Sequence, residues 1–190
     1  MNIFILNKFG LSLFVKTDLT LCRDNSDFYI PDNFDSIIIE PAIAVKINRA
    51  GKYISSQFAQ RYYSEIYIAL NIVSDNFYSD KITVTEYSLN STMEQSFYVI
   101  DNKNISELST GFIISMDTEN DIVISPSYTD PKNIIDSAIE EISRKISLKS
   151  GDIVAVTSEV NQKSQKGSCF KMYIDGLDNN YIKLLDFSIR

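Results

Sequence analysis

The sequence has no histidine among its 190 residues. Histidine is the commonest general base near neutral pH and a frequent metal ligand, so its absence excludes histidine-based catalytic triads and most transition-metal sites. Any catalysis would have to use carboxylates, lysine, tyrosine, serine or cysteine. The two cysteines, Cys22 and Cys169, lie far apart and lack the spacing of metal ligands. We expect them to be buried free thiols in a reducing cytoplasm.

Positive charge is also scarce. The chain has 18 lysines and arginines against 25 acidic residues, a net charge of −7. This balance disfavours nucleic acid or an anionic membrane as a partner. No apolar run approaches the roughly 20 residues of a membrane-spanning helix. The apolar opening, Met1–Phe9, contains Lys8 and no small-residue cleavage site follows it, so we expect a strand rather than a signal peptide.

Hydrophobic periodicity predicts a strand-dominated α+β fold with two or three helices. The best-marked helix starts at Asp130-Pro131, continues with isoleucines at helical spacing to Ile146, and ends before Gly151. A shorter helix is expected over residues 55–64. Strands are expected at 4–6, 11–15, 19–22, 36–48, 66–73, 81–84, 97–100, 112–116, 121–124, 153–157, 169–174 and 185–189. No linker or repeat interrupts the pattern, so we predict one domain over residues 1–190.

One carboxylate interrupts the most apolar strand. Glu40 lies within the run Ile37–Val45, where the burial of an ionised side chain is costly unless something compensates its charge. A metal ion, an arginine or backbone hydrogen bonds could do so. Which of these applies decides between an enzyme and a protein without catalysis.

The sequence around Glu40 resembles the fumarylacetoacetate hydrolase family, and most of all its short bacterial hydrolases and isomerases. The resemblance implies a mixed β roll around a pocket, usually assembled as a dimer. It covers most of the chain, and its motifs are Phe14–Lys16, Phe28–Asp32, Glu40, Gly51–Ile54, Phe58–Tyr63, Leu148–Ala155 and Ile182–Arg190.

The metal ligands that the resemblance implies are incomplete. The family binds Mg²⁺ or Mn²⁺ with two glutamates two residues apart and an aspartate on the next strand. Glu40 keeps the first position, Ala42 stands at the second, and Asn71 stands at the aspartate position. One carboxylate and one amide make a poor site for a hard cation that needs several oxygen ligands. Asp75 cannot readily substitute, because four residues along a strand displace it by about 13 Å.

The catalytic positions implied by the resemblance have also changed. The family's Asn-Tyr-x-x-His segment has no counterpart here, and its pocket lysine corresponds to Glu86. Its Gly-Asn-Thr stretch corresponds to Pro126–Tyr128. Its Thr-Gly-Thr-Pro turn corresponds to Val156–Glu159, which keeps only the hydroxyl of Ser158. An isolated serine without a base is more often a turn hydroxyl than a nucleophile.

Three hypotheses follow. The first is a catalytically degenerate family member, without a metal cofactor, that binds a small 2-oxo or diketo acid or a protein partner, as a homodimer or with a paralogue. The alternative is a Mg²⁺- or Mn²⁺-dependent hydrolase, isomerase or decarboxylase of a β-diketo or 2-oxo acid. In that case the metal ligands are rearranged, with Glu40 joined by Asn71 or by Glu86 and Glu159. The third is a structural scaffold, which predicts no ligand-sized pocket.

Overall fold

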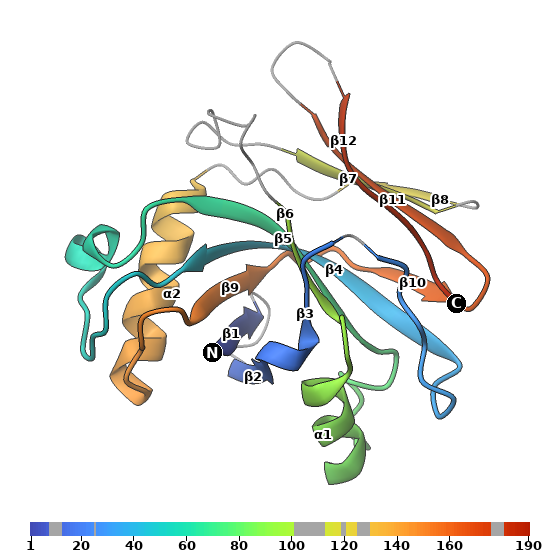
Figure 1. The fold of residues 1–190 in the computed structure, drawn as a ribbon, viewed down its shortest axis with the longest axis horizontal. Coiled ribbons are helices and arrows are strands. Elements are labelled where there is room, and N and C mark those ends of the chain that lie inside the picture. Colours follow the sequence, from blue (N-terminus) through green and yellow to red (C-terminus); the bar gives the residue numbers. More distant parts are fainter. Residues whose placement is uncertain (8–12, 25, 101–112, 119–120, 125–129, 176–180) are drawn as a thin grey trace.

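Two β-sheets form most of the protein. The computed structural model describes the chain except for residues 8–12, 25, 101–112, 119–120, 125–129 and 176–180 (Figure 1). The large sheet is mixed, with strand order β2-β1-β9-β4-β5-β6-β3, and β10 pairs with one end of β4. Its strands are β1 (Asn2–Asn7), β2 (Leu13–Thr17), β3 (Leu21–Cys22), β4 (Ser36–Lys46), β5 (Ile66–Ser74), β6 (Phe97–Ile100), β9 (Ile153–Thr157) and β10 (Gln162–Gln165).

The small sheet is antiparallel and crosses one end of the large sheet, at the upper right of Figure 1. Its strands, in the order β12-β11-β7-β8, are β7 (Ile113–Thr118), β8 (Asp121–Ile124), β11 (Cys169–Asp175) and β12 (Tyr181–Ser188). A bridge between Phe28 and Ile189 ties this sheet to the chain that leads into β4.

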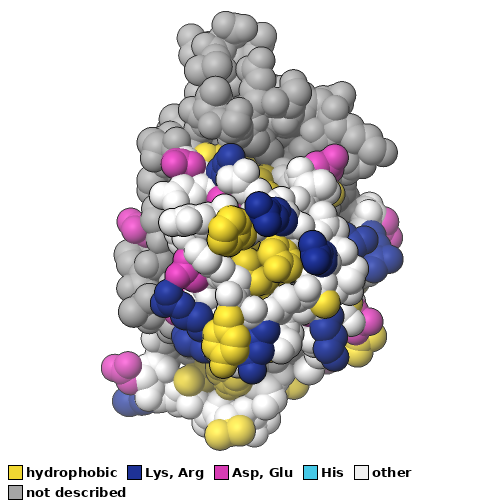
Figure 2. All heavy atoms as spheres, turned by 90° about the vertical axis from the view of Figure 1, so that its left-hand side faces the viewer, with side chains coloured by type: hydrophobic (Ala, Val, Ile, Leu, Met, Phe, Trp, Pro, Cys, Tyr) yellow, Lys and Arg dark blue, Asp and Glu magenta, His cyan; other side chains and the backbone are white. Residues whose placement is uncertain are grey.

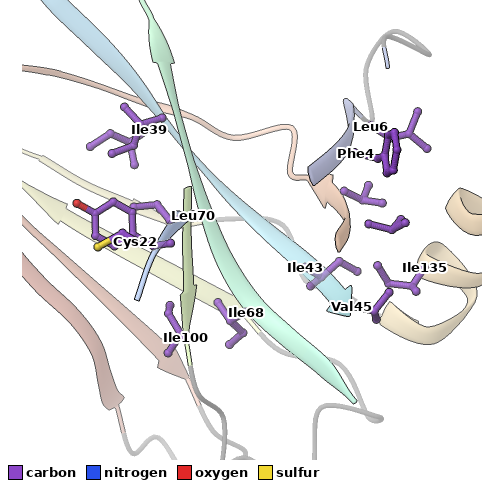
Figure 3. Close-up of a cluster of buried hydrophobic side chains, with 14 of the residues drawn as sticks. Phe4, Leu6, Cys22, Ile39, Ile43, Val45, Ile68, Leu70, Ile100 and Ile135 are labelled. Carbon is purple, nitrogen blue, oxygen red and sulfur yellow. The ribbon is translucent and has the colours of Figure 1, made fainter. Parts of the chain in front are cut away.

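Two α-helices and two 3₁₀-helices lie among the described residues. They are η1 (Asp18–Thr20), η2 (Ser56–Arg61), α1 (Val84–Thr92) and α2 (Pro131–Lys145). Asp130 caps α2 by accepting a hydrogen bond from the Asn133 N–H at 3.0 Å. The isoleucine stripe of α2 is buried against the large sheet, and Figure 3 shows Ile135 directed toward Val45 of β4. No helix in the described ranges has the length and apolar character to cross a membrane.

The predicted strand-dominated α+β fold is confirmed, with three local errors. The first half of the predicted strand at 19–22 belongs to η1 (Asp18–Thr20). Residues 81–84 are not a strand either, because Thr83 caps α1, which begins at Val84. The Thr83 side chain accepts from the Glu86 N–H, and the Glu86 carboxylate accepts from the Thr83 N–H, which together form a capping box. The third error is the missing β10, whose polar sequence Gln-Lys-Ser-Gln gives no apolar alternation. Residues 11–12 of a predicted strand lie outside the described residues.

The two faces of the large sheet carry separate hydrophobic clusters. One cluster contains Ile39, Ile43 and Val45 of β4 and packs against α2 and the small sheet (Figure 3). The other contains alanines that face each other on neighbouring strands, such as Ala42 and Ala69. Because side chains alternate along a strand, Glu40 shares this second face with Ala42.

Candidate functional site

Glu40 lies at a discontinuity in the large sheet. One edge of β4 pairs with β5 throughout, whereas the other pairs with β10 over residues 36–39 and with β9 over residues 42–46. Glu40 and Pro41 fall between these two partners, and the Ser158 N–H donates to the Pro41 carbonyl at 2.8 Å. Proline has no N–H to donate, so this gap lets it occupy a central strand. The side chain beside it is buried, since Glu40 is 2% exposed.

Both carboxylate oxygens of Glu40 accept hydrogen bonds from protein side chains. Asn71, directly opposite on β5, donates from Nδ2 to Oε2 at 2.7 Å. The Tyr78 hydroxyl donates to Oε1 at 2.6 Å. The Asn7 side chain adds a further hydrogen bond to Tyr78. Two side-chain donors, an amide and a phenol, thus compensate this carboxylate, and neither kind was among those expected from the sequence.

A buried lysine supplies the positive charge nearby. Lys16 on β2 is fully buried, and its Nζ donates to Ile72 O at 2.6 Å, Ser96 Oγ at 2.8 Å and Ser96 O at 3.1 Å. These three acceptors match the three donors of an ammonium group. Burial lowers the pKa of Lys16 to about 7, and the attraction of Glu40 partly offsets that decrease.

The pKa values of the two acidic groups change for the same reason. Burial raises the pKa of Glu40, while the hydrogen bonds from Tyr78 and Asn71 and the charge of Lys16 act to lower it. The pKa of Tyr78 is also raised, first by burial and then by the Glu40 carboxylate beside its hydroxyl. Tyr78 therefore keeps its proton and remains a donor to Glu40.

Two polar atoms on the same face have no hydrogen-bond partner among the described residues. They are Asn71 Oδ1 and Thr157 Oγ1, and both residues are completely buried. Ala42 is the direct neighbour of Thr157 on β9 and of Ala69 on β5. The alanine, at the position where the resemblance implies a second glutamate, thus lies directly opposite Thr157 and diagonally opposite Asn71.

These residues do not fit a divalent metal ion. Nowhere in the described ranges do three or more histidine, cysteine, aspartate or glutamate side chains group so that they could hold one. Glu40 is the single carboxylate in the network, and a protein donor occupies each of its oxygens. A hard cation prefers several oxygen ligands, most of them charged, and beyond this occupied carboxylate the network offers only the neutral oxygens of Asn71 and Thr157.

The other predicted site residues lie elsewhere. Ser158 Oγ donates to Val160 O at 2.7 Å and accepts from the Val160 N–H at 3.2 Å, which is the pattern of a turn hydroxyl. Glu86 is partly exposed in the first turn of α1, where it forms the capping box. Glu159 is exposed, and the structure does not group it with Glu40 and Glu86. The Pro126–Tyr128 position lies outside the described residues.

A cavity of about 460 Å³ opens toward the other end of β4. Its lining includes Leu21, Arg23, Ala44, Lys46, Val99 and Ile153. Ala44 is four residues from Glu40, or about 13 Å along a strand, so this cavity is separate from the carboxylate. Its volume is in the range of small-molecule sites, which argues against the scaffold hypothesis.

Sequence reasoning did not select Tyr78 or Lys16 as site residues. Tyr78 follows β5 in a polar segment without periodicity, and no signal in the sequence indicates that its hydroxyl returns to Glu40. Lys16 lies two residues after Phe14 and shares the buried face of β2 with it. A lysine at an inward position of such a strand is the signal that could have identified it.

The comparisons with known proteins concern the fold. No family model and no curated protein matches the sequence. Among solved structures, one from Yersinia pestis CO92, assigned to the fumarylacetoacetate hydrolase family, is 18% identical and has a TM-score of 0.74, covering 100% of this chain and 92% of its own. A Pseudomonas aeruginosa fumarylpyruvate hydrolase in complex with Mn²⁺ and pyruvate is 13% identical and has a TM-score of 0.75. The match covers 100% of this chain and 88% of the hydrolase.

A third similar structure is the 5-carboxymethyl-2-hydroxymuconate delta-isomerase from Mycobacterium smegmatis. It is 14% identical, with a TM-score of 0.76, covering 99% of this chain and 76% of its own. At this level of identity the likeness defines architecture. The protein has the fold of the fumarylacetoacetate hydrolase family, as the sequence motifs predicted.

Proposed function

We propose that this protein is a divergent member of the fumarylacetoacetate hydrolase family that has lost metal-dependent catalysis and acts by binding. The observation that carries the proposal is the protein-only network around Glu40. Asn71 Nδ2 and the Tyr78 hydroxyl occupy the two oxygens that a metal ion would need.

Electrostatics support the same proposal. The burial of Lys16 near Glu40 already gives the carboxylate a positive neighbour. A divalent cation at Glu40 would displace two donors and lie close to this lysine, where charges of like sign repel strongly because little water screens them. Ala42 and Asn71 add no negative charge to offset that repulsion.

The ligand that we propose is a small 2-oxo or diketo acid, or a protein partner such as a second copy or a paralogue. Support for the small acid comes from the fumarylpyruvate hydrolase of the same fold, which was solved with pyruvate. The cavity near Arg23 and Lys46 offers cationic groups for a carboxylate.

Calorimetric titration of metal-free protein with Mg²⁺ and Mn²⁺ tests the loss of the metal site. We expect no binding at millimolar metal, and no turnover of an acylpyruvate by protein supplied with either metal. Stoichiometric binding that disappears in Glu40→Gln would overturn the proposal, as would metal-dependent turnover. Titration with pyruvate in the absence of metal then tests the binding role directly.

The second candidate function is a metal-dependent hydrolase, isomerase or decarboxylase of a β-diketo or 2-oxo acid. The observation in its favour is the pair of unpaired oxygens, Asn71 Oδ1 and Thr157 Oγ1, on the same face as Glu40. Together with the carboxylate they are oxygen ligands of the type that Mg²⁺ and Mn²⁺ accept. Under this hypothesis Glu40→Gln abolishes activity while the fold remains intact.

A further inference from the structure

A second functional surface lies at the turn after β4 and on η2. Figure 2 shows this side of the molecule, where hydrophobic side chains are surrounded by lysines and arginines. We call this surface the basic-aromatic patch. It consists of Arg49, Lys52, Tyr53, Phe58, Arg61 and Tyr62.

Each cation of the patch lies over an aromatic ring. The guanidinium carbon of Arg61 is 4.8 Å from the centroid of Phe58, and Lys52 Nζ is 5.1 Å from the centroid of Tyr53. Arg49 lies 6.0 Å from the ring of Tyr62. Tyr53 is 71% exposed and Phe58 is 49% exposed. The three pairs therefore present both charge and large apolar rings to the solvent.

The patch has no acidic residues of its own. Residues 41–64 contain four basic residues and no aspartate or glutamate, in a chain that carries a net charge of −7. The nearest acidic side chains of the adjacent α2 already have partners: Glu140 accepts from the Ser56 N–H at the start of η2 and pairs with Arg144, and Asp136 accepts from Tyr63. In the described part of the chain, none of the three patch cations has a carboxylate partner.

The backbone beneath the patch is fixed in place. Gly51 exchanges two backbone hydrogen bonds with Leu148, at 2.9 and 3.0 Å. A side chain on Gly51 would lie 2.5 Å from the Tyr62 ring, so glycine is required for this approach. Tyr53 has a φ of 55°, an unfavourable value for a tyrosine, and its N–H donates to Ser143 O at 3.0 Å. A rigid turn thus holds an exposed aromatic ring in a strained conformation, as is frequent at binding sites.

From this geometry we propose that the basic-aromatic patch binds a short acidic segment of another protein that also carries an apolar side chain. The unpaired cations provide complementarity to the acidic residues, and Tyr53 and Phe58 provide the surface for the apolar one. The patch shares no residue with the Glu40 network, so this proposal does not depend on whether the protein is an enzyme.

Other occupants fit the charges less well. A symmetric contact between two copies that is centred on the patch would place patch against patch, and cations would then face cations. Nucleic acid or an anionic membrane presents an extended negative surface, which the net charge of −7 repels. A short acidic segment meets the positive patch without approaching the acidic remainder of the surface.

Selection from a displayed library of random short peptides, with the full chain as target, tests the proposal. We expect the selected peptides to be enriched in aspartate, glutamate and an apolar residue. Their affinity should fall by about tenfold or more in the triple variant Arg49→Gln, Lys52→Gln and Arg61→Gln, because buried or well-placed charge contacts each contribute substantially to binding. A second variant, Tyr53→Ser, should weaken binding without any change of net charge.

The matched control removes the same number of positive charges from exposed sites outside the patch. Lys81→Gln, Lys132→Gln and Lys166→Gln together should leave peptide affinity within about twofold, as distant surface charges are largely screened by salt. Selected peptides without acidic enrichment, or equal loss in both triple variants, would overturn the proposal. It would also be overturned by patch-dependent self-association in sedimentation, or by patch-dependent binding of a single-stranded oligonucleotide or of anionic vesicles tighter than that of the peptides.

Discussion

Asn71 and Glu40 face each other across β5 and β4, and the Asn71 amide donates to Glu40 Oε2 over 2.7 Å. An aspartate at residue 71 would place a second carboxylate at the same distance from Glu40. The amide converts what would be a repulsion between like charges into a hydrogen bond. The NH₂ group of Asn71, in place of one carboxylate oxygen of an aspartate, thus lets the site be stable without a metal.

Asn71→Asp should make stability depend on metal. Without metal, two carboxylates would be buried together, and we expect the free energy of unfolding to fall by about 3 kcal/mol. Mn²⁺ at 100 times its dissociation constant would restore about 2.7 kcal/mol, because it binds the folded state. Thermal unfolding with and without Mn²⁺ measures both effects. The exposed Asn76→Asp is the control, and an equal Mn²⁺ effect on the parent protein would contradict the prediction.

Tyr78→Phe should destabilise the protein by removing a single hydroxyl group. The substitution leaves Glu40 Oε1 without the donor at 2.6 Å, and hydrogen bonds to charged groups contribute about 1.5–3 kcal/mol. Urea unfolding should show a loss at the lower end of that range, because the tyrosine is 42% exposed. Tyr87→Phe is a close control, as Tyr87 has the same exposure and also packs on Phe77. Equal effects of the two substitutions would show that the hydroxyl of Tyr78 has no special role.

Lys16 should make stability rise with pH above neutrality. Its pKa is about 7 in the folded protein, against 10.5 for an unperturbed lysine. Between these values the unfolded state binds more protons than the folded state, so the free energy of unfolding increases by at most about 1.4 kcal/mol per pH unit. Below pH 7 lysine is charged in both states, and this contribution does not change.

The measurement is urea unfolding at several pH values between 7 and 10, for the parent protein and Lys16→Met. The variant should lack the part of the slope due to Lys16, whereas Lys132→Met, on the exposed side of α2, should keep it. Parallel pH profiles for the parent protein and Lys16→Met would show that the lysine keeps an ordinary pKa.

Gly51→Ala should disturb the turn that carries the basic-aromatic patch. The added methyl group would lie 2.5 Å from Tyr62 Cε1 and 2.9 Å from Ile54 Cδ1. Overpacking of this kind costs about 1–3 kcal/mol. The neighbouring Ala50→Ser enlarges an exposed side chain by one atom and should have little effect. Comparison of the two midpoints of thermal unfolding tests the prediction, which fails if both variants unfold at the same temperature.

The sequence predicts those helices and strands in which burial of one face imposes a periodic pattern of apolar residues. The isoleucine stripe and the Asp130-Pro131 start define α2, and the run from Ile37 defines β4, because each of these elements packs an apolar face against the core. The same reasoning fails for α1, which packs weakly and depends on the capping box at Thr83. It also fails for β10, which is polar and pairs through its backbone with one end of β4.

The candidate site was predicted in part. Burial of Glu40 followed from its apolar neighbours, and the resemblance indicated Asn71 as the residue across from it. Neither the donor Tyr78 nor the buried cation Lys16 was predicted as a site residue, because tertiary packing brings them near Glu40 from segments 38 and 24 residues away in sequence. Hydrogen bonds between such distant segments leave no periodic signal in the chain.

The hydrogen-bond network around Glu40 also limits how the protein can change by mutation. Aspartate at residue 71 alone adds an uncompensated buried charge, and glutamate at residue 42 alone does the same on a face lined by alanines. Sequences intermediate between the present site and a three-carboxylate metal site are therefore less stable than the present one when no cation is bound. The present site owes its stability to one asparagine, one tyrosine and one lysine around Glu40.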